Sequence, residues 1–198
     1  MARISIRIAV TAVAAAALAV TALGDTALAS TTSTAPAGSL VIQEDTTFLQ
    51  QSAQNGIIAI ALPNATPGFS TTSGFSASFP VTGGSANLGG YYGNIQVGGG
   101  LLLVNLKTGR TVIFNNLAFS ADNWAITGVP LGESAPVNLL DPAGNNVVTK
   151  TGATQNLTAD DLEIDPAGAS YVDTKLATTF FQGGQHTGTL ALTFTPAG

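Results

Sequence analysis

A single histidine is the first residue of this chain to consider for chemistry. His186 lies in the glycine-rich segment 182–188, just before an apolar stretch near the C-terminal end. An exposed imidazole can ligate a metal or a haem iron, or act as a general base. The chain has no second histidine and no cysteine, so the usual histidine and thiolate metal sites cannot be completed. A solvated turn residue is therefore the simpler interpretation of His186.

Acidic residues form one dense cluster, and calcium is the ligand that it could hold. Asp161, Glu163 and Asp165 follow a period of two within and just after a predicted strand over 157–164. They would then share one face, while the apolar residues between them share the other. Calcium takes six to eight oxygen ligands, so these three could contribute only part of a site. The spacing lacks the central glycine of the helix–loop–helix calcium loop, and a half-buried strand with an acidic outer face explains it equally.

A carboxylate-dependent hydrolase is the enzymatic hypothesis. Asp122, Glu133 and Asp141 lie near the ends of predicted strands and could converge on a glycosidic bond, which requires two carboxyl groups about 5–9.5 Å apart. No Gly-x-Ser-x-Gly nucleophile motif occurs in the chain. Because no group of residues has catalytic spacing, we expect a non-catalytic protein, with the secreted hydrolase as the alternative.

Two adjacent tyrosines provide a possible binding surface. Tyr91 and Tyr92 are flanked by Gly90 and Gly93, as in an exposed turn. Tyrosine and Trp124, the chain's one tryptophan, would suit stacking on a sugar ring or covering a haem face. Strand alternation would bury one of the two tyrosines, so a single exposed tyrosine is the plainer expectation.

The start of the chain has the pattern of an export signal. Residues 1–29 contain two arginines, then an uncharged apolar run over 8–23, and small residues at Ala27 and Ala29. This pattern is typical of a secretory signal peptide cleaved between Ala29 and Ser30. The apolar run is shorter than the roughly 20 residues that span a bilayer. We therefore expect a secreted protein with no membrane span in the mature form.

Charge and cysteine content exclude several classes of partner and site. The full chain has a formal net charge of −5, and removal of residues 1–29 leaves four scattered basic and ten acidic side chains, a net charge of −6. Nucleic acids and anionic membrane surfaces require a basic patch, so neither is expected as a partner. Without cysteine there is no disulfide framework and no acylated anchor. The expected partner is an extracellular or cell-wall ligand of unknown identity, and no cofactor is expected.

Hydrophobic periodicity predicts a mainly β domain. Residues 30–38 read as a flexible leader and residues 39–198 as a single domain. Capping aspartates predict two short peripheral helices, over 46–54 and 166–177. Apolar runs between glycine, proline and asparagine turns predict strands near 41–42, 57–62, 75–81, 92–97, 101–106, 111–119, 124–129, 135–140, 157–164, 179–181 and 187–195. The polar segment 145–156 reads as a long loop, and the whole pattern favours an antiparallel β-sandwich.

Several stretches resemble known exported proteins. The segments Phe79-Pro-Val-Thr-Gly-Gly84 and Gly93-Asn-Ile-Gln-Val-Gly-Gly-Gly-Leu101, with Phe180-Phe-Gln-Gly-Gly184, resemble small uncharacterised secreted β-rich proteins of actinobacteria. The first two segments also resemble the HtaA haem-uptake domain, a β-rich cell-surface module. That resemblance implies haem bound through a tyrosine supported by a histidine. In this chain the candidates for those roles are Tyr91 or Tyr92 with His186.

The sequence thus favours a secreted extracellular or cell-envelope-associated module that acts by binding or as a structural component. An HtaA-like haem-binding surface protein and a secreted carboxylate-dependent hydrolase are the alternatives. Haem and calcium are the two cofactors to test.

Overall fold

The computed structural model describes residues 34–198. The predicted signal peptide, residues 1–29, and the first residues of the predicted leader lie outside the described part. The leader was predicted to continue to residue 38, but the first strand, β1 (Ala37–Glu44), includes its last two residues. Leu40 of β1 is buried, which gives this segment an apolar face to pack.

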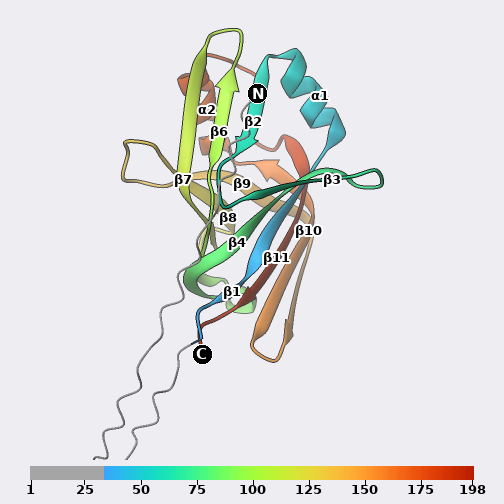
Figure 1. Ribbon diagram of the computed structural model, residues 1–198, viewed down its shortest axis with the longest axis vertical. Helices are drawn as coiled ribbons and strands as arrows, with labels where there is room; N and C mark the ends of the chain where they lie inside the picture. Colours follow the sequence, from blue (N-terminus) through green and yellow to red (C-terminus); the bar gives the residue numbers. More distant parts are fainter. Residues whose placement is uncertain (1–33) are drawn as a thin grey trace, which may run out of the picture. The chain divides into compact units, whose positions relative to one another are not determined.

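The described residues form one antiparallel sheet, two α-helices and a short 3₁₀ turn (Figure 1). The helices are α1 (Thr46–Gln54) and α2 (Pro166–Leu176), and the 3₁₀ turn is η1 (Leu88–Gly90). After β1 the strands are β2 (Ile57–Ala61), β3 (Thr66–Ser70), β4 (Gly74–Asn87), β5 (Tyr92–Val97), β6 (Leu101–Asn105), β7 (Arg110–Ser120), β8 (Ala125–Pro130), β9 (Val137–Thr151), β10 (Thr154–Ile164) and β11 (His186–Thr195).

The sheet closes on itself, which corrects the predicted β-sandwich. Its strand order is β2-β6-β7-β5-β4-β1-β11-β10-β9-β8, and β8 also pairs with β7. The eight strands from β7 to β8 in this order form a barrel, because the pairing of β7 with β8 closes it, with Phe119 opposite Ile126. Strands β2 and β6 extend the sheet beyond β7, and β3 pairs with β4. The mainly β composition with two short helices is confirmed.

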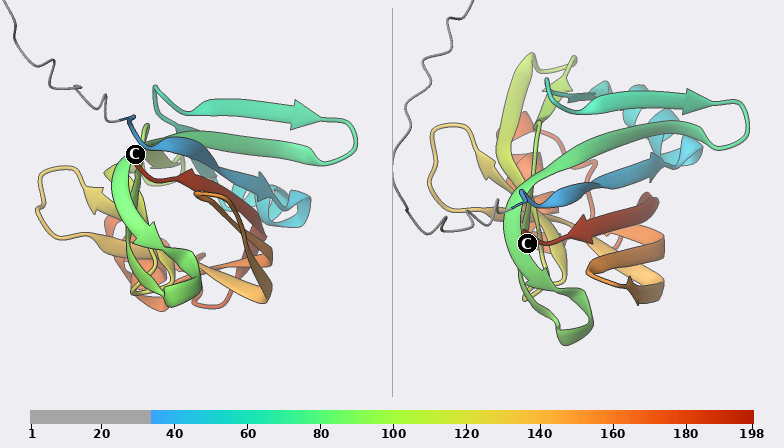
Figure 2. Two further views of the ribbon diagram at one scale, coloured as in Figure 1. Left: turned by 90° about the horizontal axis from the view of Figure 1, so that it is seen from below. Right: turned by 60° about the horizontal axis from the view of Figure 1, so that its bottom comes forward.

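Two glycines allow β4 and β5 to follow the curvature of the barrel. Gly84 has φ +102° and Gly93 has φ +90°, values that residues with a side chain rarely adopt. A Cβ atom at Gly84 would lie 2.2 Å from the Asn94 carbonyl oxygen, and one at Gly93 would lie 2.2 Å from that of Ser85. The ladder also shifts register between Val81 and Gly83. Bulges and glycines of this kind bend strands, and Figure 2 shows the green strand β4 curving around the barrel.

The interior of the barrel is apolar. The largest fully buried side chains include Phe114, Phe119 and Phe194, together with leucines of β1, β10 and β11. Along β10 and β11 the buried side chains alternate with more exposed ones, as the period of two requires, whereas β7 and β8 each contain four consecutive buried residues. Burial of this cluster is the main driving force for closure, because the described part has no disulfide and few ion pairs.

Both predicted helices are confirmed, and each begins at its capping aspartate. The Asp45 carboxylate accepts a hydrogen bond of 2.8 Å from the Phe48 amide. The Asp165 carboxylate accepts bonds from the Ala167 and Gly168 amides, with Pro166 in the first turn. These bonds satisfy amides that have no partner within the helix. Neither helix has the length and hydrophobicity needed to cross a membrane.

Three local predictions were wrong. The segment 145–156, predicted as a loop, forms the turn and flanking residues of a long β9–β10 hairpin. In this part of the hairpin the side chains on both faces of the strands are largely exposed and polar. The alternation of apolar and polar residues that indicates a strand is therefore absent. Residues 179–181, predicted as a strand, form an irregular segment whose Phe181 amide bonds to the Asp173 carboxylate. Strand β3 was not predicted because its residues are mostly exposed.

Candidate functional site

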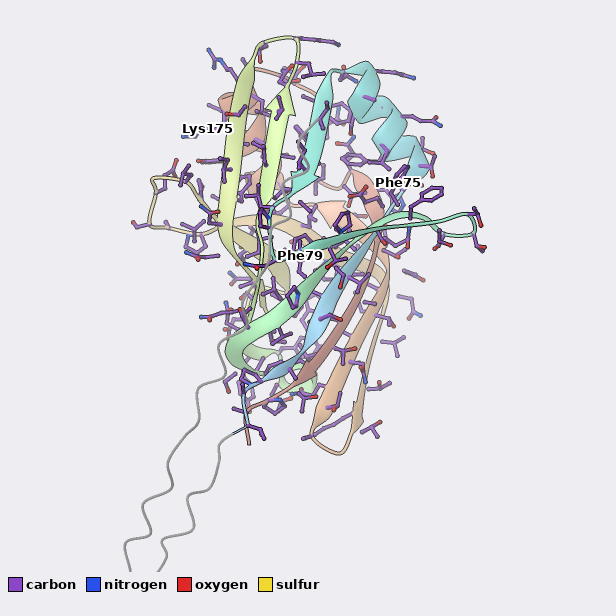
Figure 3. All side chains as sticks on the ribbon, viewed as in Figure 1. Phe75, Phe79 and Lys175 are labelled. Atoms are coloured by element: carbon purple, nitrogen blue, oxygen red, sulfur yellow. The ribbon has the colours of Figure 1, made fainter. Side chains whose placement is uncertain are left out.

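An apolar pocket lies between the barrel, the β2–β6 extension and the two helices. It is partly open and has a cavity volume of about 150 Å³. A dry, apolar cavity of roughly this volume accommodates a single aromatic ring. Figure 3 labels Phe79 of β4, one of the lining residues. The lining is otherwise mostly aliphatic: Ile42, Glu44, Phe48, Leu49, Ala59, Ala61, Ala77, Phe79, Leu101, Leu103, Phe114, Leu117, Ile126, Leu139, Leu140, Ile164, Gly168, Val172, Phe181 and Thr187.

Glu44 is the one ionisable residue that lines this pocket. Its half-buried position raises the pKa of the carboxyl, and burial is the sole cause of that shift. Within residues 34–198 the Glu44 carboxylate takes part in none of the side-chain hydrogen bonds or ion pairs, which include those of Glu133 and Asp161. Thr187, beside it in the pocket, donates its hydroxyl to the Leu162 carbonyl at 2.8 Å instead. A half-buried carboxylate with no hydrogen-bond partner among the described residues therefore lies at the edge of a mostly apolar space.

The position of Glu44 follows from strand alternation. Leu40, Ile42 and Glu44 share one face of β1, and Leu40 is almost fully buried. The cap at Asp45 then turns the chain into α1, and the Asp45 amide bonds to the Thr187 carbonyl at 2.9 Å. Sequence reasoning missed Glu44 because only a two-residue strand was predicted at 41–42. Extending the alternation from Leu40 would have placed this carboxylate inward.

Aromatic side chains from two distant segments meet beside the pocket. Phe48 of α1 lies 5.9 Å from Phe180, measured between ring centroids, and Phe180 lies 5.0 Å from Phe181. Phe48 and Phe181 both line the pocket. This contact joins α1 to the irregular segment after α2, so a conformational change in either segment would alter access to the pocket.

The structure does not bring the predicted ligand-binding residues together. Tyr91 and Tyr92 follow η1, whose Leu88 amide bonds to the Gln155 side chain, and Gln155 is opposite Phe194 in the ladder. His186 lies eight residues from Phe194 along β11, a separation of about 26 Å at about 3.3 Å per residue. The tyrosines and His186 are therefore at opposite ends of β11. A ligand role for any one of them remains a prediction.

His186 instead lies beside the acidic residues. Its Nδ1 is 2.5 Å from a carboxylate oxygen of Asp161, and its backbone is opposite Glu163 in the ladder. Asp165 is occupied as the cap of α2. The predicted facing is found, because Leu162 and Ile164 are buried. Residues 34–198 contain no group of three histidine or acidic side chains arranged to hold a metal ion, so the geometry gives calcium no support.

Asp141 joins this cluster from β9. It is opposite Glu163 in the ladder. Burial, followed by the charge and hydrogen bonding of Asp165 and the charge of Glu163, raises the pKa of Asp141 to about 6. Negative charges nearby disfavour the ionisation of Asp141, so this residue holds a proton at mildly acidic pH.

The three carboxylates of the hydrolase hypothesis occupy different places. Asp122 accepts a bond from the Gly93 amide in the turn after β7. Glu133 follows β8 and accepts bonds from the Tyr171 hydroxyl and the ammonium of Lys175, the α2 residue labelled in Figure 3. The β7–β8 ladder runs from Ser120 at the Asp122 end to the Leu131–Ile113 bond at the Glu133 end, about 23 Å. This pair is too far apart to act on one glycosidic bond.

Comparison with known proteins gives a likeness of fold only. No family model matches the chain, and no curated protein matches it. Among solved structures, it is similar to the C-terminal domain of HtaA from Corynebacterium glutamicum. The two share 13% sequence identity with a TM-score of 0.51, over 84% of this chain and 99% of that chain. The resemblance noted from the sequence thus extends to the fold.

The residues of this chain do not fit the haem site that the sequence resemblance implied. Haem iron takes histidine, cysteine, methionine or tyrosine as axial ligands, and none of these lines the pocket. The candidate tyrosines follow η1, which is linked to the Phe194 end of β11, whereas His186 begins that strand.

Proposed function

We propose that this chain is an exported, non-catalytic binding module that holds a small apolar ligand in the pocket beside Glu44. The observation that supports this function is the unpartnered carboxylate of Glu44 in an otherwise apolar cavity. An apolar pocket with a small number of placed polar groups is the usual form of a small-molecule site.

The chemistry of the pocket defines the ligand class. The volume of about 150 Å³ fits one aromatic ring or an aliphatic group of similar size. The half-buried carboxylate of Glu44 would be stabilised by a hydrogen-bond donor, and most strongly by a cation. The ligand is therefore a small apolar amine, or a larger molecule that inserts such a group.

We also propose that the protein is exported and does not catalyse a reaction. The signal-like segment 1–29 supports a place outside the cytoplasm, in the medium or at the cell envelope. The separation of Asp122 from Glu133, and the use of Glu133 in contacts with α2, argue against a hydrolytic centre that uses both of these carboxylates. N-terminal sequencing of the secreted protein tests the cleavage after Ala29.

Binding of phenethylamine and its neutral counterpart ethylbenzene tests the pocket. We expect saturable binding of both by calorimetry or NMR shifts, with the amine preferred. Glu44→Gln should reduce the preference for the amine about tenfold or more, equivalent to about 1.4 kcal/mol, and leave the neutral compound unaffected. Below the raised pKa of Glu44 the wild-type preference should also fall, because the carboxylate is then protonated.

Two variants serve as controls. Ala61→Phe fills the pocket and should abolish binding of both compounds. Glu133→Gln removes a carboxylate that lies outside the pocket and should change neither affinity. If wild type binds neither compound, or if Ala61→Phe binds as well as wild type, the proposal is wrong.

A further inference from the structure

Tyr91, which is exposed, and Trp124, which is partly buried, form an aromatic pair beside the η1 turn, at the opposite end of the barrel from α1. Their ring centroids are 4.8 Å apart and the ring planes are inclined by 49°. Tyr91 is 62% exposed. The two residues come from separate turns: Tyr91 ends η1, and Trp124 ends the turn between β7 and β8. The pairing of β5 with β7 brings these turns together.

The backbone of both residues is unusual for large side chains. Tyr91 has φ +55° and Trp124 has φ +54°, in the left-handed region where glycine or asparagine is normally found. Bulky residues persist in this region where the surrounding structure holds them, and such positions cluster at functional sites. Glycine would relieve the strain at both turns, so the aromatic side chains are present despite a local cost.

The surroundings hold this pair rigidly. Trp124 packs edge-on against the buried ring of Phe119, with 5.4 Å between centroids. The Tyr91 amide bonds to the Leu88 carbonyl, and Leu88 is fully buried. The Asn87 carboxamide caps the Gly90 amide at 2.9 Å. In Figure 2 (right) the light-green turn between β4 and β5 projects at the lower edge of the described elements. The result is a rigidly held pair in which the Tyr91 ring is exposed and the Trp124 ring is partly accessible.

Polar but not basic side chains surround the rings. Asp122 and Asn123 are exposed in the same turn as Trp124, and the Asp122 carboxylate bonds to the Gly93 amide. Asn94, opposite Ser120, is also exposed. Carboxylate and amide groups beside an aromatic face match a ligand that has flat C–H surfaces and many hydroxyls. The electron-rich ring faces attract the partly positive C–H groups of a pyranose, and the polar groups bond to its hydroxyls.

We infer that Tyr91 and Trp124, with Asp122 and Asn123, form a saccharide-binding surface. The ligand class is a β-1,4-linked pyranose chain, which presents flat C–H faces to both rings. None of these four residues lines the pocket of the proposed function. Gln155 links η1 to the Phe194 end of β11, whereas the pocket residue Thr187 lies near the other end of that strand. An exported module with such a surface could be retained on an extracellular glycan.

Other exposed aromatic residues have simpler explanations. Phe69 and Phe75, the latter labelled in Figure 3, are directly opposite each other in the β3–β4 hairpin, with 4.9 Å between ring centroids. Such cross-strand pairs stabilise a hairpin without a ligand. The neighbouring Tyr92 is 56% exposed, but its ring lies beside Gly90, and its hydroxyl is 3.3 Å from the Asn87 side chain.

The chain has one tryptophan, so intrinsic fluorescence reports directly on this site. We expect cellohexaose or chitohexaose to produce a saturable change in Trp124 emission, with a Kd of about 1 mM or tighter, typical of a weak contact worth roughly 4 kcal/mol. Hexaglycine should produce none. Tyr91→Gly should weaken binding at least tenfold while the unfolding midpoint stays within about 2 °C of wild type, because it removes an exposed ring and relieves the strained backbone.

Two variants test whether binding requires the Tyr91–Trp124 pair or only an exposed tyrosine. Tyr91→Phe keeps the ring and should retain glycan affinity. Tyr92→Ala removes a tyrosine that is nearly as exposed but is not paired with Trp124, and it should also retain affinity. The inference is overturned if neither hexasaccharide changes the emission, if Tyr91→Gly binds as wild type does, or if Tyr92→Ala loses as much affinity as Tyr91→Gly. These results do not depend on the amine titrations that test the pocket.

Discussion

Asp141 shows how one residue couples the stability of this fold to pH. Its pKa is raised to about 6 by burial and by the carboxylates of Asp165 and Glu163. The unfolded chain has an ordinary aspartate pKa and loses its proton first as pH rises. Unfolding is therefore favoured by rising pH between about 4 and 6, and the destabilisation is fully present above that range.

We predict that Asp141→Asn raises the unfolding midpoint at pH 7.5 but changes it little at pH 4. The expected gain is about 1 kcal/mol after allowance for solvent screening of a half-exposed group, or roughly 3 °C. Thermal unfolding by circular dichroism at the two pH values measures it. Glu133→Gln is the control of opposite sign, because bonds from Tyr171 and Lys175 lower the pKa of Glu133. A gain that is equal at both pH values would contradict the assignment.

Individual strands and helices differ in how fully the sequence predicted them. Both helices were found because an aspartate caps each one and its hydrogen bonds are local. Strand β9 was cut short because its second half is exposed on both faces and lacks alternation. Closure of the barrel was not predicted, since it depends on pairings between strands far apart in sequence, such as β1 with β11, which no local pattern specifies. Glu44 was missed because the strand predicted at 41–42 was too short to show that Glu44 shares a face with Leu40.

The glycines that shape β4 permit a prediction about this element. Gly84 and Gly109 both have positive φ, at +102° and +71°, but only at Gly84 would a Cβ atom meet backbone. Gly84→Ala should therefore cost about 3 kcal/mol or more, and Gly109→Ala about 1 kcal/mol, the cost of the backbone conformation alone. Urea unfolding of the two variants gives the difference. Equal losses would show that β4 tolerates a side chain at its bend.

At the scale of the whole barrel, Gln155 links parts of the sheet that are distant in sequence. It is buried in β10, accepts a 2.8 Å bond from the Leu88 amide and donates a 2.9 Å bond to the Ala86 carbonyl, at the turn between β4 and β5. Gln155→Leu would leave that amide and carbonyl buried without partners, so we predict a loss of about 2 kcal/mol and a fall of roughly 6 °C in the unfolding midpoint. In the wild type, the Leu88 amide should exchange with solvent only through global unfolding, whereas in the variant it should exchange through local opening of η1.

Gln54→Leu, at an exposed position on α1, is the matched control and should change neither the unfolding midpoint nor the exchange of the Leu88 amide. If the Leu88 amide of Gln155→Leu still exchanges at the global rate, η1 is held by the burial of Leu88 alone, and the polar link is not what couples this turn to the rest of the barrel.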